Sequence, residues 1–144
     1  MRDILVSLAV AFVCAVGFGI VFGIRAKELW LAGMAGFVTR IVIILCEAAA
    51  MGRFTYTFIT ALVGTLYAEL VGRARKSSIA KFMYPAMVLL IPGDILYKMI
   101  VSMMKLDSAG ITANFVTLMK SLLGIALGCM LGAMVFNVKR RKES

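Results

Sequence analysis

The chain lacks histidine altogether, and it is poor in cysteine, proline and acidic residues. Its 144 residues include no histidine, three cysteines, two prolines and seven acidic side chains. Without imidazole, histidine-based metal sites, haem ligation through histidine and histidine acid–base chemistry are all excluded. Cys14, Cys46 and Cys129 stand alone in apolar runs without CxxC spacing, which is typical of small hydrophobic residues and not of a zinc site or a redox pair. The sequence therefore predicts no metal and no cofactor.

Apolar residues dominate what is present. They make up 62% of the chain, whereas a soluble globular domain carries roughly 45–50%. One small core cannot enclose that excess, so much of the apolar surface must face lipid. We therefore predict an integral membrane protein. We also predict that it is not an enzyme, because no nucleophile–base pair can be assembled and the GxxxxGK[ST] nucleotide motif is absent.

Five apolar stretches are long enough to cross a bilayer, since a helical span needs about 20 mostly apolar residues. Lipid offers no hydrogen bonds to the backbone, so helices are the expected structure. The connections are short, which predicts a single domain over residues 1–144, an all-α, compact five-helix transmembrane bundle. The spans are expected at residues 4–24, 29–51, 54–72, 82–104 and 111–137.

The basic residues predict the orientation. Most of the 16 lie in the first and third connections and at the C-terminus. Positive charge stays on the cytoplasmic side, so we expect an outside N-terminus and an inside C-terminus in a bacterial inner membrane. Arg25 and Lys27 directly follow the first apolar run, which is longer than a signal-peptide core and is expected to be retained. These charges are expected to anchor loops, not to bind nucleic acid.

Charged residues inside the spans are the strongest functional indicators, since each costs about 2.5–3.5 kcal/mol at the bilayer centre. Arg40 and Asp94 are both predicted near mid-membrane, and Glu47 and Lys98 share their respective helix faces. Arg40 and Asp94 could form a structural ion pair. Alternatively, Arg40 and Lys98 hold an anionic solute with Asp94 as counter-ion, because a guanidinium offers a carboxylate two donors. Asp94 and Glu47 are candidate proton carriers.

Pro92 and Gly93 stand next to Asp94 in the fourth span. Pro92 removes a backbone donor and crowds the preceding turn, so we expect the helix to kink or break near mid-membrane. Broken helices expose backbone groups that bind solutes in transporters, although a passive kink would leave the same pattern. Pro92 and Gly93 are therefore candidate solute-binding residues beside Asp94.

Glycines recur at helical spacing and predict close helix packing. Either these faces pack the bundle internally, or at least one of them docks a partner subunit. The positions are Gly19 and Gly23 on the first span, Gly64 on the third, and Gly124, Gly128 and Gly132 on the fifth.

Several motifs occur in a fixed order: residues 16–22, Gly36 with Arg40, residues 58–64, and Ile91-Pro92-Gly93 with Tyr97. Together they resemble the threonine/serine exporter family, in the small-subunit type equivalent to the C-terminal five-span half of the fused exporters. The resemblance covers roughly residues 10–140. The chain departs from the family pattern at Leu89, where a proline is usual, and at Asp94, where a small or apolar residue is usual.

The resemblance implies a transport role beside a larger five-span membrane subunit. Fused members export threonine and serine, and a similar two-chain system is associated with succinate. Tyr97 joins the candidate solute-binding residues by this resemblance. We predict a subunit of a secondary exporter for small carboxylate-bearing metabolites, either threonine/serine or a dicarboxylate such as succinate. The alternatives are a structural or assembly subunit without a transport site of its own, and a homo-oligomeric channel lined by the third and fifth spans.

Overall fold

The computed structural model describes residues 2–88 and 90–142, with side chains for 3–88 and 90–135, and Leu89 lies outside these ranges. The described part is all-helical. Four helices are long and apolar enough to cross a bilayer, and α4 with α5 makes a fifth if this bent pair is one span. This confirms the predicted all-α membrane class. The elements are α1 (Arg2–Val21), η1 (Ala26–Glu28), α2 (Leu29–Ala48), α3 (Arg53–Ala74), α4 (Ile79–Val88), α5 (Gly93–Met104) and α6 (Ser108–Lys142).

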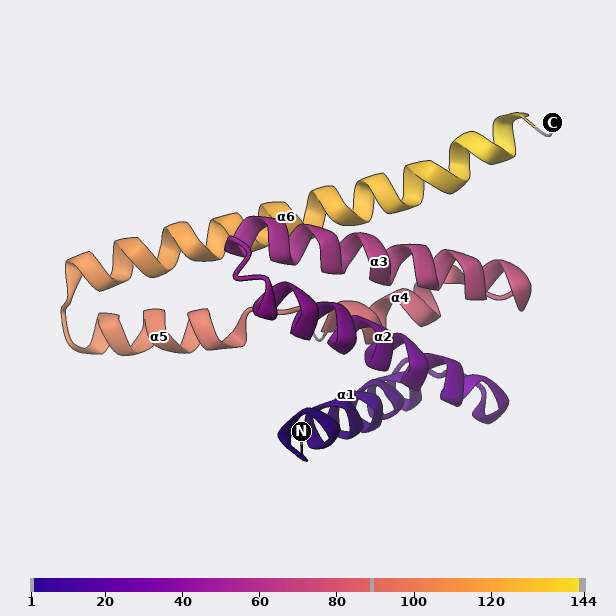
Figure 1. Cartoon of the computed structure of the whole chain (residues 1–144), viewed down its shortest axis with the longest axis horizontal. Helices are drawn as coiled ribbons and strands as arrows, with labels where there is room; N and C mark the ends of the chain where they lie inside the picture. Colours follow the sequence, from indigo (N-terminus) through magenta and orange to yellow (C-terminus); the bar gives the residue numbers. More distant parts are fainter. Residues whose placement is uncertain (1, 89, 143–144) are drawn as a thin grey trace.

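The helices form a body with a projecting hairpin. In the body, α2 packs on α1, α3 and α4, and α6 packs along α3. The α5 helix packs mainly on α6, and the two extend past the α2–α3 connection (Figure 1). The reason lies in helix length, because the 35 residues of α6 rise roughly 52 Å, whereas the 20 of α2 rise roughly 30 Å. The shape is thus more extended than the compact bundle we expected.

The contact between α3 and α6 is a backbone-to-backbone packing face. A Cβ on Gly128 would lie 2.6 Å from the Phe58 carbonyl oxygen, and one on Gly124 would lie 2.8 Å from the Phe54 oxygen. A Cβ on Gly132 would lie 2.8 Å from the Thr65 Cβ. These three glycines therefore pack the two helices together within the chain.

The other predicted packing glycines differ among themselves. Gly19 faces α2 at Leu29 and Ala32, and Gly64 faces α4 at Ala86 and Met87.

Gly23 does not pack against any neighbour. It lies beyond the end of α1 at φ +68, where a Cβ would meet nothing within 4 Å. The Gly23 N–H donates to the Ile20 oxygen, and the Ile24 N–H donates to the Gly19 oxygen. This left-handed turn ends the helix, as glycine commonly does. Gly23 therefore does not pack the bundle internally among the described residues, and its alternative role at a partner interface stays a prediction.

Hydroxyl residues follow the same α3–α6 face. Thr57, Thr60 and Thr65 on α3 and Ser121 on α6 are at most 1% exposed. The Thr60, Thr65 and Ser121 hydroxyls each donate to the carbonyl four residues earlier in their own helix. The face is therefore closed by packing in this chain, which argues against a channel lined by these two helices.

The packing between α3 and α6 can be tested directly by adding a single methyl group to a glycine of α6. We expect Gly128→Ala to lower the midpoint of thermal unfolding in detergent, because backbone atoms of α3 cannot move aside and overpacking costs about 1–3 kcal/mol. Gly17→Ala is the matched control, since a Cβ there meets nothing within 4 Å and alanine favours a helix. Equal midpoints for the two variants would contradict the described packing.

Candidate functional site

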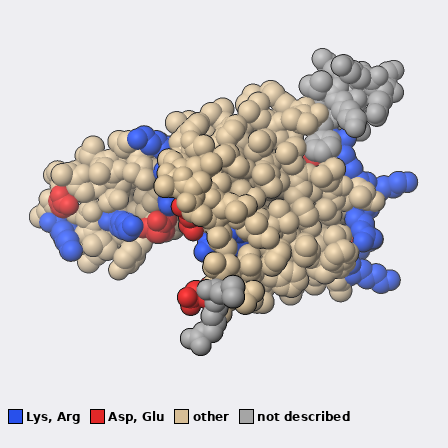
Figure 2. Space-filling view, viewed as in Figure 1, with Lys and Arg blue, Asp and Glu red and all other residues tan. Residues whose placement is uncertain are grey.

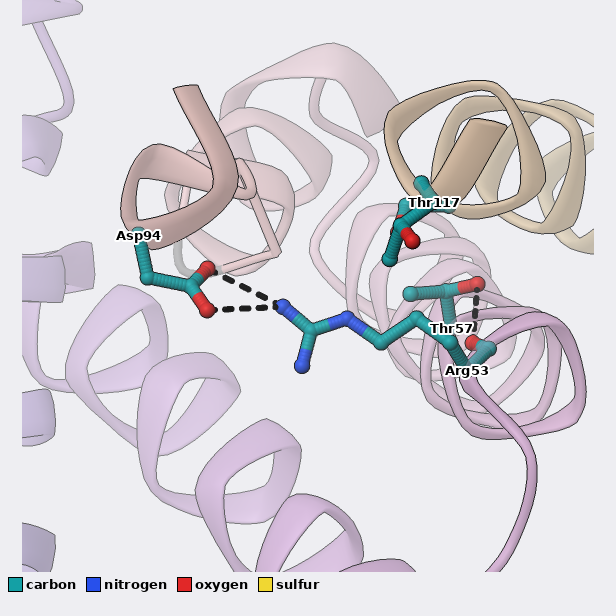
Figure 3. Close-up of polar contacts among 5 residues, drawn as sticks. Arg53, Thr57, Asp94 and Thr117 are labelled. Carbon is teal, nitrogen blue, oxygen red and sulfur yellow. Dashed lines mark hydrogen bonds and ion pairs between the residues drawn. The ribbon is translucent and has the colours of Figure 1, made fainter. Parts of the chain in front are cut away.

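Asp94, in the first turn of α5, is paired with Arg53, the first residue of α3. One guanidinium nitrogen, Nη2, donates to both carboxylate oxygens, at 3.0 Å to Oδ1 and 3.2 Å to Oδ2. Figure 3 shows the Arg53 side chain reaching from α3 across to Asp94 on α5. The two side chains are 36% and 53% exposed. The pair is thus accessible to a solute.

The helix dipoles stabilise the charge of Asp94 and disfavour the charge of Arg53. A carboxylate in the first turn of α5 is stabilised by the positive end of that helix. Arg53 lies at the positive end of α3, where a cation is disfavoured. The guanidinium therefore depends on neighbouring side chains for compensation.

Arg53 has more binding capacity than Asp94 uses. Its Nε is buried and has no hydrogen-bond partner among the described residues. A guanidinium carries five donors, and only Nη2 contacts Asp94. Arg53 can therefore donate hydrogen bonds to a second anionic or carbonyl group.

Tyr56 adds an aromatic surface to the ion pair. Arg53 lies over its ring, with Cζ 5.4 Å from the centroid. We call Arg53, Asp94 and Tyr56 the Arg53 cluster. It contains one cation and one anion, so it is formally neutral and suits a ligand that carries both signs of charge. Glu47 is exposed near the end of α2.

Arg40 does not pair with Asp94. Its Nε donates to the Ser7 hydroxyl on α1 at 2.7 Å, and the two residues line a hollow of about 170 Å³. Arg40 is eight residues from the end of α2 at Ala48, roughly 12 Å along the helix. Of the two alternatives considered for these residues, the structural Arg40–Asp94 ion pair is therefore not formed.

Arg40 and Asp94 also do not lie at the same depth as predicted, because α4 is short. The ten residues of α4 rise roughly 15 Å, and the chain at 90–92 then continues outside any helix. Together they bring Asp94 level with Arg53, where α3 begins. Asp94 thus lies at the end of the body and not at its middle.

The remaining candidate residues lie around α5. Tyr97 is 69% exposed, and Lys98 is also exposed. Pro92 is buried and borders an apolar groove of about 390 Å³ that also includes Tyr84 and Met87. A Cβ on Gly93 would meet nothing within 4 Å. Asp94 is thus the candidate on α5 that the structure joins to another helix by an ion pair.

Arg53 and Tyr56 were missed by sequence reasoning. Arg53 directly precedes the expected span 54–72, so its position alone indicates only a loop charge. A signal was present, because an arginine at the start of a predicted helix opposes the helix dipole and therefore requires an anionic neighbour. Tyr56, three residues later on the same helix face, adds an aromatic surface for the cation.

The fold and the cluster define a multi-pass membrane protein with an accessible pair of opposite charges where two helices begin. Residues 7–138 match the family described as Threonine/Serine exporter, ThrE. The chain therefore belongs to the threonine/serine exporter family, which is a family of transporters and not of enzymes. No curated protein and no solved structure matches the chain significantly.

Proposed function

We propose that the chain is a subunit of a secondary exporter for small carboxylate-bearing metabolites, and that the Arg53–Asp94 pair is its solute site. The observation that carries the proposal is an ion pair whose two side chains are both accessible, Arg53 at 36% and Asp94 at 53% exposure. The pair occurs in a member of an exporter family. An exposed pair contributes only about 0.2–1 kcal/mol to stability. Opening it to admit a solute therefore costs little.

The chemistry of the pair favours an amino acid over a dicarboxylate. The Arg53 guanidinium suits the α-carboxylate as a two-pronged donor, and Asp94 suits the α-ammonium group. Succinate has no cation for Asp94, so it would require another basic residue, for which Arg40 and Lys98 are the candidates. Threonine and serine are accordingly the proposed solutes.

The break beside the site is proposed to act as the moving element. The axes of α4 and α5 differ by 46° across the residues between them, and Pro92 has no backbone donor to continue a helix. Gly93 leaves open space beside Asp94. Movement of α5 would separate Asp94 from Arg53, and Asp94 and Glu47 are the proposed proton carriers that couple this step to a gradient.

We further propose a larger five-span partner subunit and an N-out, C-in orientation in the bacterial inner membrane. Figure 2 supports the orientation, because Lys and Arg gather at the end of the body opposite the projecting hairpin. The hairpin supports the partner, because large apolar residues at its tip are exposed, such as Met104 and Leu106. A second subunit could cover these apolar residues in place of lipid.

Charge-preserving substitutions separate a solute site from a structural ion pair. We expect Arg53→Lys to reduce threonine and serine efflux from cells by at least about tenfold, because it loses a charge-assisted donor pair. The swap Arg53→Asp with Asp94→Arg keeps an ion pair, but we expect it not to restore efflux. Lys105→Gln, at the far end of the hairpin, is the control and should export normally.

The same variants are quantified in the membrane fraction, so that loss of insertion is not read as loss of transport. Wild-type efflux by the charge-swapped chain would assign the pair to structure. Succinate efflux without threonine efflux would contradict the amino-acid assignment. Liposomes that contain only this purified chain should not transport threonine, and full transport by them would refute the partner.

The orientation is tested by cysteine accessibility in a chain whose native cysteines are replaced. Ala50→Cys and Lys105→Cys should react with a membrane-impermeant maleimide in intact cells. Lys27→Cys and Lys76→Cys should react only after permeabilisation, because positive charge is retained inside. The reverse pattern would show that the N-terminus is inside.

A further inference from the structure

A polar pocket lies at the opposite end of the body from the Arg53 cluster. It has a volume of about 250 Å³ and is lined by the basic residues Arg25, Arg75, Lys76 and Lys81. We call it the basic pocket. Arg25 follows α1, Arg75 and Lys76 follow α3, and Lys81 is in the first turn of α4. Figure 2 shows Lys and Arg side chains gathered along this end of the molecule.

In the described part of the chain, none of the four cations forms an ion pair, and Glu28 is the one acidic residue among the lining residues. Among the described residues the ion pairs are Arg53 with Asp94 and Arg73 with Glu69, and neither includes a lining residue of the basic pocket. Like charges around one cavity repel each other. An anion in the cavity would remove this repulsion and gain several charge-assisted hydrogen bonds.

The backbone beside the basic pocket also favours an anion. Ser77 and Ser78 line the cavity and contribute hydroxyl donors. Ser78 directly precedes α4, which begins at Ile79. The free N–H groups and positive dipole end of a helix favour phosphate groups. A phosphate is thus the anion that fits the donors best.

Glu28 restricts which phosphate compound fits. It lines the same cavity, and its Oε2 is buried with no hydrogen-bond partner in the described part of the chain. A buried carboxylate oxygen without a hydrogen bond is unfavourable until a donor reaches it. A phosphate ester that carries a hydroxyl would satisfy the carboxylate while its phosphate meets the cations.

An apolar groove on α4 indicates where the rest of such a ligand would lie. Lys81 lines the basic pocket, and Tyr84, three residues later on the same helix face, lines the apolar groove of about 390 Å³ with Met87 and Val88. The polar and apolar cavities therefore follow one another along one helix. The order of the two cavities matches a lipid headgroup followed by its acyl chain. Basic pockets between membrane helices bind anionic lipid headgroups.

We propose that the basic pocket binds the phosphate of a hydroxylated phospholipid headgroup of the phosphatidylglycerol type, with one acyl chain in the groove along α4. Bound lipid holds the α3–α4 connection against the end of α1. The site is separate from the Arg53 cluster and does not depend on the identity of the exported solute.

Binding is measured by native mass spectrometry of the full chain in neutral detergent, titrated with phosphatidylglycerol, phosphatidylcholine or glycerol 3-phosphate. We expect phosphatidylglycerol to bind at least about tenfold more tightly than phosphatidylcholine. Arg75→Gln with Lys81→Gln should remove that difference. Lys105→Gln with Lys120→Gln removes the same charge from exposed positions on the hairpin and should leave it unchanged.

The outcomes separate the possible sources of the phosphate. If glycerol 3-phosphate competes with phosphatidylglycerol but binds more weakly, the lipid assignment is supported, since the acyl chain adds contact in the groove. Equal affinities for the two would overturn the lipid assignment in favour of a soluble phosphate ester. Equal losses in both double variants would overturn the basic pocket as the site. Circular dichroism of each variant establishes that it is folded.

Glu28 provides an independent check on the headgroup. Wild-type chain should prefer phosphatidylglycerol to phosphatidic acid, which has no headgroup hydroxyl. Glu28→Ala should bind the two lipids equally. A preference that survives Glu28→Ala would overturn the assigned role of this carboxylate.

Discussion

The close contact between the glycine face of α6 and the backbone of α3 determines where everything else lies. Gly124 and Gly128 allow α6 to approach α3 at distances that a side chain would prevent. Because α6 extends well beyond the first residue of α3, it carries the α5 hairpin with it. This arrangement places Asp94 within 3.0 Å of Arg53. The close approach that the α6 glycines allow thus helps to determine the position of the candidate solute site.

The α4 helix connects the two polar regions of the chain. Its first turn contributes Lys81 to the basic pocket, and its far end leads through Pro92 to Asp94 in the Arg53 cluster. A lipid held along α4 would stabilise the part of the body against which α5 moves in the proposed transport step. The lipid site and the solute site would then act on opposite ends of the same short helix, one as an anchor and the other as the moving part.

Much of the fold could be predicted from sequence, because hydrophobic length and glycine spacing are local properties. The apolar runs predicted the helices, and the glycines of α6 indicated a packing face that the structure shows against α3. The ion pairing could not be predicted, because counting residues from the ends of the spans does not show where a break moves the residues that follow it. The short α4 and the extended α6 change those depths, so Asp94 pairs with Arg53 and Arg40 bonds to Ser7.

The central claim, that solute binds at the Arg53–Asp94 pair, is tested most directly by solute protection of a nearby cysteine. Ile91, 60% exposed and three residues before Asp94, is replaced by cysteine in a chain without native cysteines, in membranes of cells that export. Leu106→Cys, at the 87% exposed tip of the hairpin, is the control. We expect threonine or serine to slow maleimide labelling at position 91 and to leave position 106 unchanged. Labelling at position 91 that is equally fast with and without saturating threonine or serine would contradict the account.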